Sequence, residues 1–160
     1  MRQMPSAVAQ PHLQRPTSDD EVRAGEELLV ARVGPWRVLV PMRHVARVHA
    51  AALPAARLAG APVVAVDGAQ WPVVFVASLL GADEVRLGAS DQLVAVRGGG
   101  RCLMLWVNAV EDVVEHAPAP PAGDVAPPDL VAGYSGPRAL AVLDVPRLLS
   151  LAGAAGQGAP

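Results

Sequence analysis

The side chains that could perform chemistry in this 160-residue chain are few and dispersed. There is one cysteine, Cys102, and there are four histidines, His12, His44, His49 and His116. His44 and His49 are five residues apart, which on a helix turns them to different faces, whereas metal-binding pairs favour a spacing of three or four. One cysteine allows neither a disulfide within the chain nor a thiolate metal site. These residue types therefore predict no catalytic centre, no metal site and no bound cofactor.

Two further patterns resemble reactive motifs but lack their context. The run Gly98-Gly99-Gly100 leads into an apolar strand and not into a helix N-terminus, so a hairpin turn is favoured over a phosphate-binding loop. The serines at positions 78, 90, 135 and 150 do not lie in a strand-to-helix elbow of the kind that activates a nucleophile. Enzymatic activity is therefore not expected.

The charge balance excludes several classes of partner. The net charge is −2 and the pI is about 6.0, so there is no electrostatic case for binding nucleic acid or an anionic membrane surface. The longest uncharged run, residues 68–82, is shorter than the roughly 20 residues that a membrane-spanning helix needs. The first residues contain no continuous apolar signal segment. We expect a cytoplasmic protein without direct membrane insertion.

Short apolar runs divided by turn residues predict the strands of small β-barrels. Short helices are predicted at residues 42–49, 77–80 and 145–151, and residues 108–115 form either a helix or a strand. Residues 102–107 are almost all apolar, which predicts burial on both faces, inside paired barrels or at a partner surface. The predicted strands are 28–33, 36–40, 63–66, 71–76, 93–96, 102–107, 130–134 and 139–143.

The order of these elements repeats along the chain as hairpin, helix, hairpin, helix, which predicts two structurally similar halves. Residues 1–25 are polar and contain prolines, and residues 152–160 are rich in glycine and alanine, so both ends are predicted to be disordered tails. The folded domain is expected to span residues 26–151.

An ordered series of five segments resembles the CheW-like domain of bacterial chemotaxis. No single motif is specific, but the series runs from residue 28 to residue 151. The resemblance implies an all-β fold of two small SH3-like, five-stranded β-barrels packed together, with a few short helices. The segments are residues 28–34, 38–48, 62–81, 91–115 and 134–149.

The resemblance also implies a function. CheW-like domains occur as free adaptors and as the regulatory domain of CheA-type kinases, so it implies a non-catalytic adaptor that couples the cytoplasmic tip of a chemoreceptor to a CheA-type histidine kinase. One barrel would pair with the kinase's own CheW-like domain, and an apolar groove between the barrels would take a receptor helix. The expected partner-binding residues are Val45, Arg47, Val48, Val64, Val66, Asp67, Gly68 and Trp71.

Two charged residues depart reciprocally from the family pattern. Arg47 stands where the pattern has an acidic residue in its first short helix, and Asp67 stands where it has an arginine before Gly68. The exchange predicts that Arg47 and Asp67 face each other at the mouth of the groove as a charge-reversed pair, which would exclude partners matched to the usual charges.

Together with Asp67, the departures at Phe75 and Ala77 leave the choice of partner open. Phe75 and Ala77 replace an aspartate and an arginine of the pattern, and Asn108 replaces an aspartate. A divergent protein that binds only one of the two partners, or that acts as a spacer in arrays, is one alternative. A small-ligand-binding β-barrel or an enzyme is another, and it would need a polar constellation in the groove.

The three tryptophans are either core residues or partner anchors, since tryptophan is enriched at binding hot spots. Trp36 and Trp106 lie within predicted strands, which favours core packing. Trp71 lies at a hairpin edge between Gln70 and Pro72, where both roles remain open.

Overall fold

The computed structural model describes residues 21–51, 56–58, 61–66, 68–82, 88–122 and 126–157. Most of the predicted N-terminal tail lies outside these residues, and so does Asp67.

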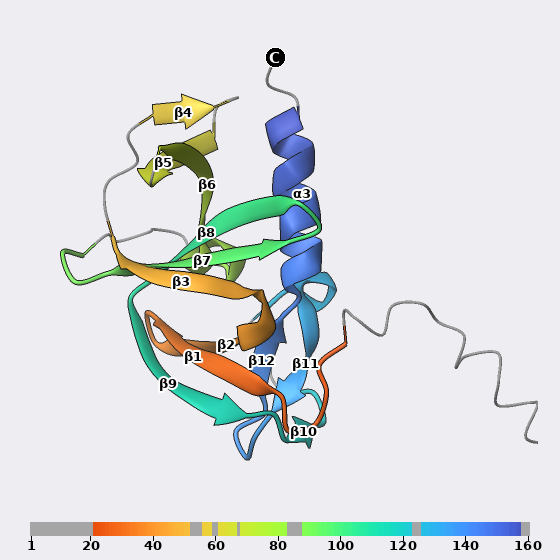
Figure 1. The fold of residues 1–160 in the computed structure, drawn as a ribbon. Helices are drawn as coiled ribbons and strands as arrows, with labels where there is room; N and C mark the ends of the chain where they lie inside the picture. Colours follow the sequence, from red (N-terminus) through yellow and green to blue (C-terminus); the bar gives the residue numbers. More distant parts are fainter. Residues whose placement is uncertain are drawn as a thin grey trace, which may run out of the picture.

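The described strands form two six-stranded sheets, which we call barrel 1 and barrel 2 (Figure 1). Each contains one strand more than the five predicted, because the short strands β10 and β4 add to an edge. Barrel 1 has the strand order β10 (Pro118–Ala119), β11 (Val131–Ser135), β12 (Leu140–Leu143), β2 (Trp36–Pro41), β1 (Glu27–Val33), β9 (Ala109–Glu115). Barrel 2 has the order β3 (Val45–Ala50), β7 (Gln92–Gly98), β8 (Arg101–Val107), β6 (Ala69–Phe75), β5 (Ala61–Val66), β4 (Ala56–Leu58).

The predicted helix at residues 42–49 is wrong. A single turn, η2 (Met42–His44), is followed directly by strand β3, which pairs with β7. The β-branched residues Val45 and Val48 disfavour a helix locally, and the ladder with β7 supplies the hydrogen bonds that the helix would have made. Tertiary pairing therefore overrides the helical start that Pro41 indicated.

The remaining helices are short apart from the last. Helix α2 (Val76–Leu79) confirms the predicted helical turn, and Gly81 follows it with φ of 88°, a conformation that glycine adopts without strain. A second single turn, η3 (Pro128–Leu130), precedes β11. Helix α3 (Val145–Gln157) continues past residue 151, where the sequence predicted its end, and packs against β7 and β8.

Each barrel combines strands from both halves of the sequence. The predicted repeat is present only in part: each half contains six described strands and ends in a helix, but the single helical turn follows the second strand in the first half and the fourth strand in the second half. However, barrel 1 combines the hairpin β1–β2 with β9–β12, and barrel 2 combines β3–β6 with the hairpin β7–β8. The parallel pairs β2–β12 and β6–β8 join the halves within each barrel. Neither half of the sequence is therefore a structural unit.

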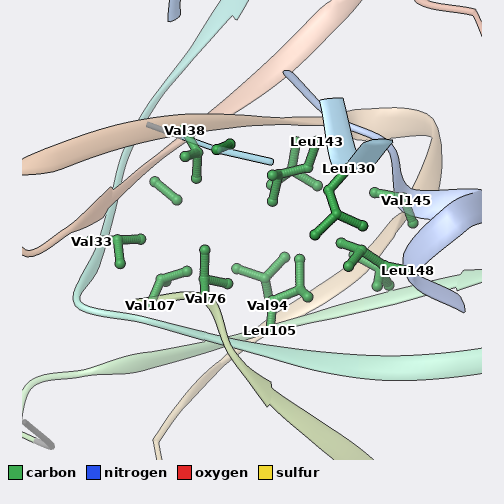
Figure 2. Packing of buried hydrophobic residues seen from close by; sticks show 14 of the residues in the cluster. Val33, Val38, Val76, Val94, Leu105, Val107, Leu130, Leu143, Val145 and Leu148 are labelled. Carbon is green, nitrogen blue, oxygen red and sulfur yellow. The ribbon is translucent and has the colours of Figure 1, made fainter. Parts of the chain in front are cut away.

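The largest core lies between the barrels (Figure 2). Hydrophobic side chains of β1 and β2 meet those of β7, β8, α2 and α3 in the region between the barrels, where the resemblance implied an apolar groove. Among its members are Val33, Val38, Val76, Val94, Leu105, Val107, Leu143 and Leu148.

Strand β8 contributes to two cores at once. Leu103, Leu105 and Val107 belong to the core between the barrels, and Met104 and Trp106 belong to the core of barrel 2. This alternation confirms the predicted burial on both faces. Barrel 1 has a smaller core of its own, built from Leu28, Val30, Leu39 and Val142.

Candidate functional site

A hollow lies between the barrels, beside the β1–β2 turn. It has a volume of about 210 Å³ and lies between that turn in barrel 1 and β6, α2 and β8 in barrel 2. Its lining is almost entirely apolar, and we call it the inter-barrel pocket. It is lined by Val33, Gly34, Pro35, Trp36, Phe75, Ala77, Ala82, Trp106, Val107 and Asn108.

Aromatic rings form a large part of this lining. Trp106 is 5% exposed and belongs to the core of barrel 2, in agreement with its predicted role. The rings of Phe75 and Trp106 are in contact, with centroids 5.4 Å apart. Trp36 is only partly buried and faces the pocket as well as the core, so the core prediction missed its second role. The sequence feature that could have indicated this second role is the position of Trp36 directly after the Gly34-Pro35 turn.

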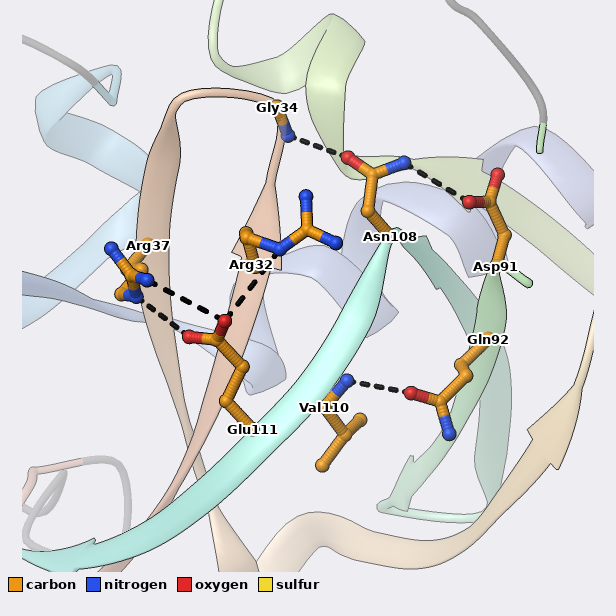
Figure 3. A network of polar contacts seen from close by, with 8 residues as sticks. All are labelled: Arg32, Gly34, Arg37, Asp91, Gln92, Asn108, Val110 and Glu111. Atoms are coloured by element: carbon orange, nitrogen blue, oxygen red, sulfur yellow. Dashed lines mark hydrogen bonds and ion pairs between the residues drawn. The ribbon is translucent and has the colours of Figure 1, made fainter.

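The buried carboxylate of Asp91 contacts Asn108, one of the residues that line the inter-barrel pocket (Figure 3). Asp91, which is 4% exposed, accepts hydrogen bonds from the backbone N–H of Gly88 at 2.7 Å, from Trp106 Nε1 at 2.8 Å and from Asn108 Nδ2 at 3.1 Å. Asn108 Oδ1 in turn accepts a hydrogen bond from the backbone N–H of Gly34. The sequence reasoning did not identify this Asp91–Asn108–Gly34 chain, which connects barrel 2 to the β1–β2 turn of barrel 1.

The protonation state of Asp91 follows from these contacts. Burial by itself would raise the pKa of the Asp91 carboxyl, and it is the largest single effect. The hydrogen bonds from Gly88, Trp106 and Asn108, together with the positive charge of Arg32, outweigh burial and hold that pKa below its usual range. Asp91 is therefore an ionised acceptor at neutral pH.

A second link between the barrels lies beside the first (Figure 3). The side chain of Gln92, at the start of β7, accepts a hydrogen bond at 2.7 Å from the backbone N–H of Val110 on β9. Next to Val110 on β9, Glu111 forms an ion pair with Arg37 at 2.6 Å and one with Arg32 at 3.6 Å. These ion pairs are partly exposed, so each contributes at most about 1 kcal/mol.

A different hollow, which we call the barrel-2 cleft, lies between β3, β7 and the β5–β6 hairpin. It has a volume of about 470 Å³ and brings together three of the predicted partner-binding residues, Arg47, Val66 and Trp71. The guanidinium of Arg97 lies 5.8 Å from the centroid of the Trp71 ring, within the range of a cation–π contact. The complete lining is Ala46, Arg47, His49, Val66, Ala69, Trp71, Ala95 and Arg97.

The other predicted site residues lie in different surroundings. Val64 is 4% exposed and belongs to the core of barrel 2, and Val45 is partly buried against the core between the barrels. Val48 is exposed on β3, and Gly68 occupies the β5–β6 turn with φ of 80°.

Of the predicted Arg47–Asp67 pair, only Arg47 lies among the described residues. Arg47 lies on strand β3 and not in a helix, which corrects the setting in which the pair was predicted. It lines the same cleft as Val66 and Ala69, the ends of the strands that flank residues 67 and 68. Asp67 itself lies outside the described residues, so the pair stays a prediction.

Within the described part of the chain, no three His, Cys, Asp or Glu side chains gather closely enough to hold a metal ion. His116 is buried, and its Nδ1 has no hydrogen-bond partner. Burial lowers the pKa of the His116 imidazole, while the nearby Glu26 carboxylate acts weakly in the opposite direction. No described helix has the length and apolar character needed to cross a bilayer.

Comparison with known proteins identifies a family match that covers both barrels. A family model described as the CheW-like domain matches residues 27–153. Among solved structures, the chain is similar to the scaffolding protein TtCheW from Thermoanaerobacter tengcongensis, with a TM-score of 0.61 and 16% sequence identity over 74% of this chain and 87% of that chain. At this identity the likeness concerns the fold. No curated protein sequence matches the chain.

Proposed function

This chain belongs to the CheW-like domain family, with the two SH3-like barrels of that fold, and from that premise we propose that it couples chemoreceptors to a CheA-type histidine kinase. The family is one of non-catalytic chemotaxis scaffolds, so signal would pass as a change in conformational populations and not through chemistry in this chain. The observation that carries the proposal is the family match over residues 27–153, which includes both barrels. A cytoplasmic location follows from the two proposed partners.

We propose the inter-barrel pocket as the receptor site. Its volume of about 210 Å³ suits the anchoring side chains of a helix that lies across the opening, and not a whole helix. Apolar anchors at helical spacing are the usual way in which a groove captures an amphipathic helix. Trp36 and Phe75 offer the large, rigid apolar contacts that dominate such interfaces.

We propose the barrel-2 cleft as the site for the kinase's CheW-like domain. Its described lining contains Arg47, His49 and Arg97 and no acidic residue. Trp71 and Val66 supply apolar contact area within the same hollow. A partner surface that combines acidic and apolar side chains would complement this cleft in charge and in polarity.

The barrels are coupled directly at the rim of the inter-barrel pocket. Asn108 lines that pocket and donates a hydrogen bond to Asp91, which directly precedes strand β7 of barrel 2. A ligand in the pocket would thus contact a group that connects the two barrels. This connection offers a physical route by which receptor binding would bias the kinase-binding barrel.

Two capture experiments performed separately test the proposal. The full chain is immobilised and exposed either to a CheA-type regulatory domain or to a chemoreceptor tip fragment, and the bound fraction is measured. We expect Trp36→Ala to weaken receptor capture and Arg97→Glu to weaken kinase capture, each with little effect on the other partner. Arg138→Glu, an exposed charge reversal outside both hollows, is the control.

The outcomes separate the alternatives. Capture of only one partner by the unmodified chain would support a divergent adaptor or an array spacer. Capture of neither would contradict the coupling function. Equal losses for both partners in each variant would show that the two hollows are not separate sites.

A further inference from the structure

Asn108 is the residue at which the chain crosses from barrel 2 to barrel 1. Strand β8 ends directly before it, and strand β9 begins directly after it. Its backbone N–H donates a hydrogen bond to the carbonyl oxygen of Arg32 on β1 at 2.9 Å. Its side chain accepts a hydrogen bond from the backbone N–H of Gly34 in the β1–β2 turn and donates one to Asp91, directly before β7 (Figure 3). One side chain at the crossing therefore contacts both barrels.

The backbone of Asp91 is held by two hydrogen bonds. Its N–H donates to the carbonyl oxygen of Gly88 at 3.1 Å, and its own carbonyl oxygen accepts from the N–H of Ala51 at 3.0 Å, which continues the β3–β7 ladder. A Cβ added to Gly88 would lie 3.1 Å from Asp91 Oδ1, so the turn brings the carboxylate close to the backbone. The carboxylate is therefore fixed in place at the start of β7.

The carboxylate of Asp91 orients two residues of the inter-barrel pocket. Oδ2 accepts a hydrogen bond from Trp106 Nε1 at 2.8 Å, and Oδ1 accepts one from Asn108 Nδ2 at 3.1 Å. Trp106 and Asn108 both line the pocket, and Asp91 itself is buried. Asp91 would therefore act on a ligand through the residues that it orients.

The charge of Asp91 fixes the direction of these hydrogen bonds. An ionised carboxylate offers acceptors and no donor. Asn108 must therefore turn its Nδ2 toward Asp91, which leaves Oδ1 to accept from the N–H of Gly34. The opposite orientation of the amide would place a donor against that N–H and an acceptor against the carboxylate. The position of the β1–β2 turn, and of Trp36 that follows it, thus depends on the negative charge of Asp91.

We propose that Asp91 is a positioning residue for the inter-barrel pocket, which holds Trp106 on the barrel 2 side and, through Asn108, the β1–β2 turn with Trp36 on the barrel 1 side. A ligand then meets two walls that are already in place, so ordering them costs less free energy on binding. This inference deepens the proposed function and rests on it for the identity of the ligand, the chemoreceptor tip.

Asp91→Asn tests the proposal with a side chain of nearly the same shape. It replaces one acceptor oxygen by a donor, so two donors of the network must face each other. Gly34 is exposed, and its N–H would exchange rapidly without its partner. We expect the Gly34 amide to exchange about tenfold faster by NMR and the receptor tip fragment to bind about tenfold more weakly. Capture of the CheA-type regulatory domain should be unchanged.

The double variant Asp91→Asn with Asn108→Asp gives the decisive measurement. The donor and acceptor roles are then exchanged: the carboxylate at position 108 accepts from Gly34 and from the new amide, whose oxygen accepts from Trp106. We expect slow Gly34 exchange and receptor capture to return. The control is Val30→Ala, a truncation in the separate core of barrel 1, which should lower thermal stability and leave both measurements unchanged.

The outcomes distinguish this inference from the proposed function. Unchanged Gly34 exchange or unchanged receptor capture in Asp91→Asn would overturn the positioning role, as would a double variant that does not recover slow exchange. Equal losses of receptor and kinase capture would also overturn it, because they indicate a general loss of structure. If the unmodified chain captures no receptor tip fragment, the proposed function fails, and Gly34 exchange in the two variants still decides the positioning role.

Discussion

At the scale of single residues, the most informative side chains are the polar ones that the barrels bury. Asp91 is buried in a setting that would ordinarily raise its pKa, and three donated hydrogen bonds keep it ionised. One of the donors is Asn108, which stands where the family pattern has an aspartate. An aspartate there would have no proton to donate to Asp91, so the amide is required by its neighbour.

The first prediction concerns this pair. Asn108→Asp places a carboxylate at the hydrogen-bonding distance now occupied by an amide, 3.1 Å from Asp91. The lost donor and the new repulsion are expected to lower the free energy of unfolding by about 1–3 kcal/mol, measured by urea denaturation. The double variant Asn108→Asp with Asp91→Asn restores one donor and one acceptor and should recover part of the loss. If the two changes add without interaction, the hydrogen bond contributes nothing to stability.

The second prediction concerns His116. Its pKa is lowered in the folded protein, so the folded state resists protonation more than the unfolded state does. The stability that this difference provides is complete above the unfolded pKa of about 6.5 and is lost as the pH falls below it.

Thermal unfolding between neutral and mildly acidic pH, with and without His116→Gln, measures this effect. The unmodified protein should lose stability over this range, and the variant should lose less because its side chain does not titrate. Parallel curves for the two proteins would contradict the assignment to His116.

At the scale of elements, β3 shows how partner strands decide local structure. Its sequence predicts a short helix after Pro41, but pairing with β7 makes it an edge strand that bounds the barrel-2 cleft. As a result Val48 is exposed, whereas Val64 on β5 faces the core of barrel 2. The predicted set of contact valines therefore contains both surface and core residues.

The third prediction separates these two valines. Val64→Asp buries an unpaired carboxylate and is expected to lower the free energy of unfolding by more than about 2 kcal/mol, with loss of cooperative unfolding if the barrel opens. Val48→Asp changes an exposed position and should alter stability by no more than about 0.5 kcal/mol. Chemical denaturation of both variants measures the difference. Equal losses would show that β3 is packed against another part of the chain.

At the scale of the whole molecule, the exchange of hairpins between the sequence halves determines how the chain folds. Barrel 1 needs β1–β2 from the first half and β9–β12 from the second, and barrel 2 needs β7–β8 from the second half and β3–β6 from the first. The core between the barrels contains residues from both halves and joins them further.

The fourth prediction follows from this exchange. Two fragments divided between residues 82 and 88 should each lack a stable fold, because each carries strands whose neighbours are on the other fragment. An equimolar mixture should regain the β-sheet circular dichroism spectrum and the dispersed amide resonances of the intact protein. A fragment that folds alone would show that one half contains an independent barrel.

Sequence alone determined the features that depend on neighbouring residues. Alternating and continuous apolar runs predicted most strands, including the two buried faces of β8, and glycine-containing turns predicted the hairpins, because β-branched residues and positive φ angles act locally. The ordered series of segments also identified the family, which the match over residues 27–153 confirms.

Tertiary structure decided everything that depends on residues far apart in the chain. The strand state of β3, the core between the barrels and the hydrogen bonds that connect Asp91, Asn108 and Gly34 each require contacts between elements that local patterns do not connect. The physical reason is that propensity and periodicity operate within one element, whereas burial and strand pairing are properties of two or more elements brought together by the fold.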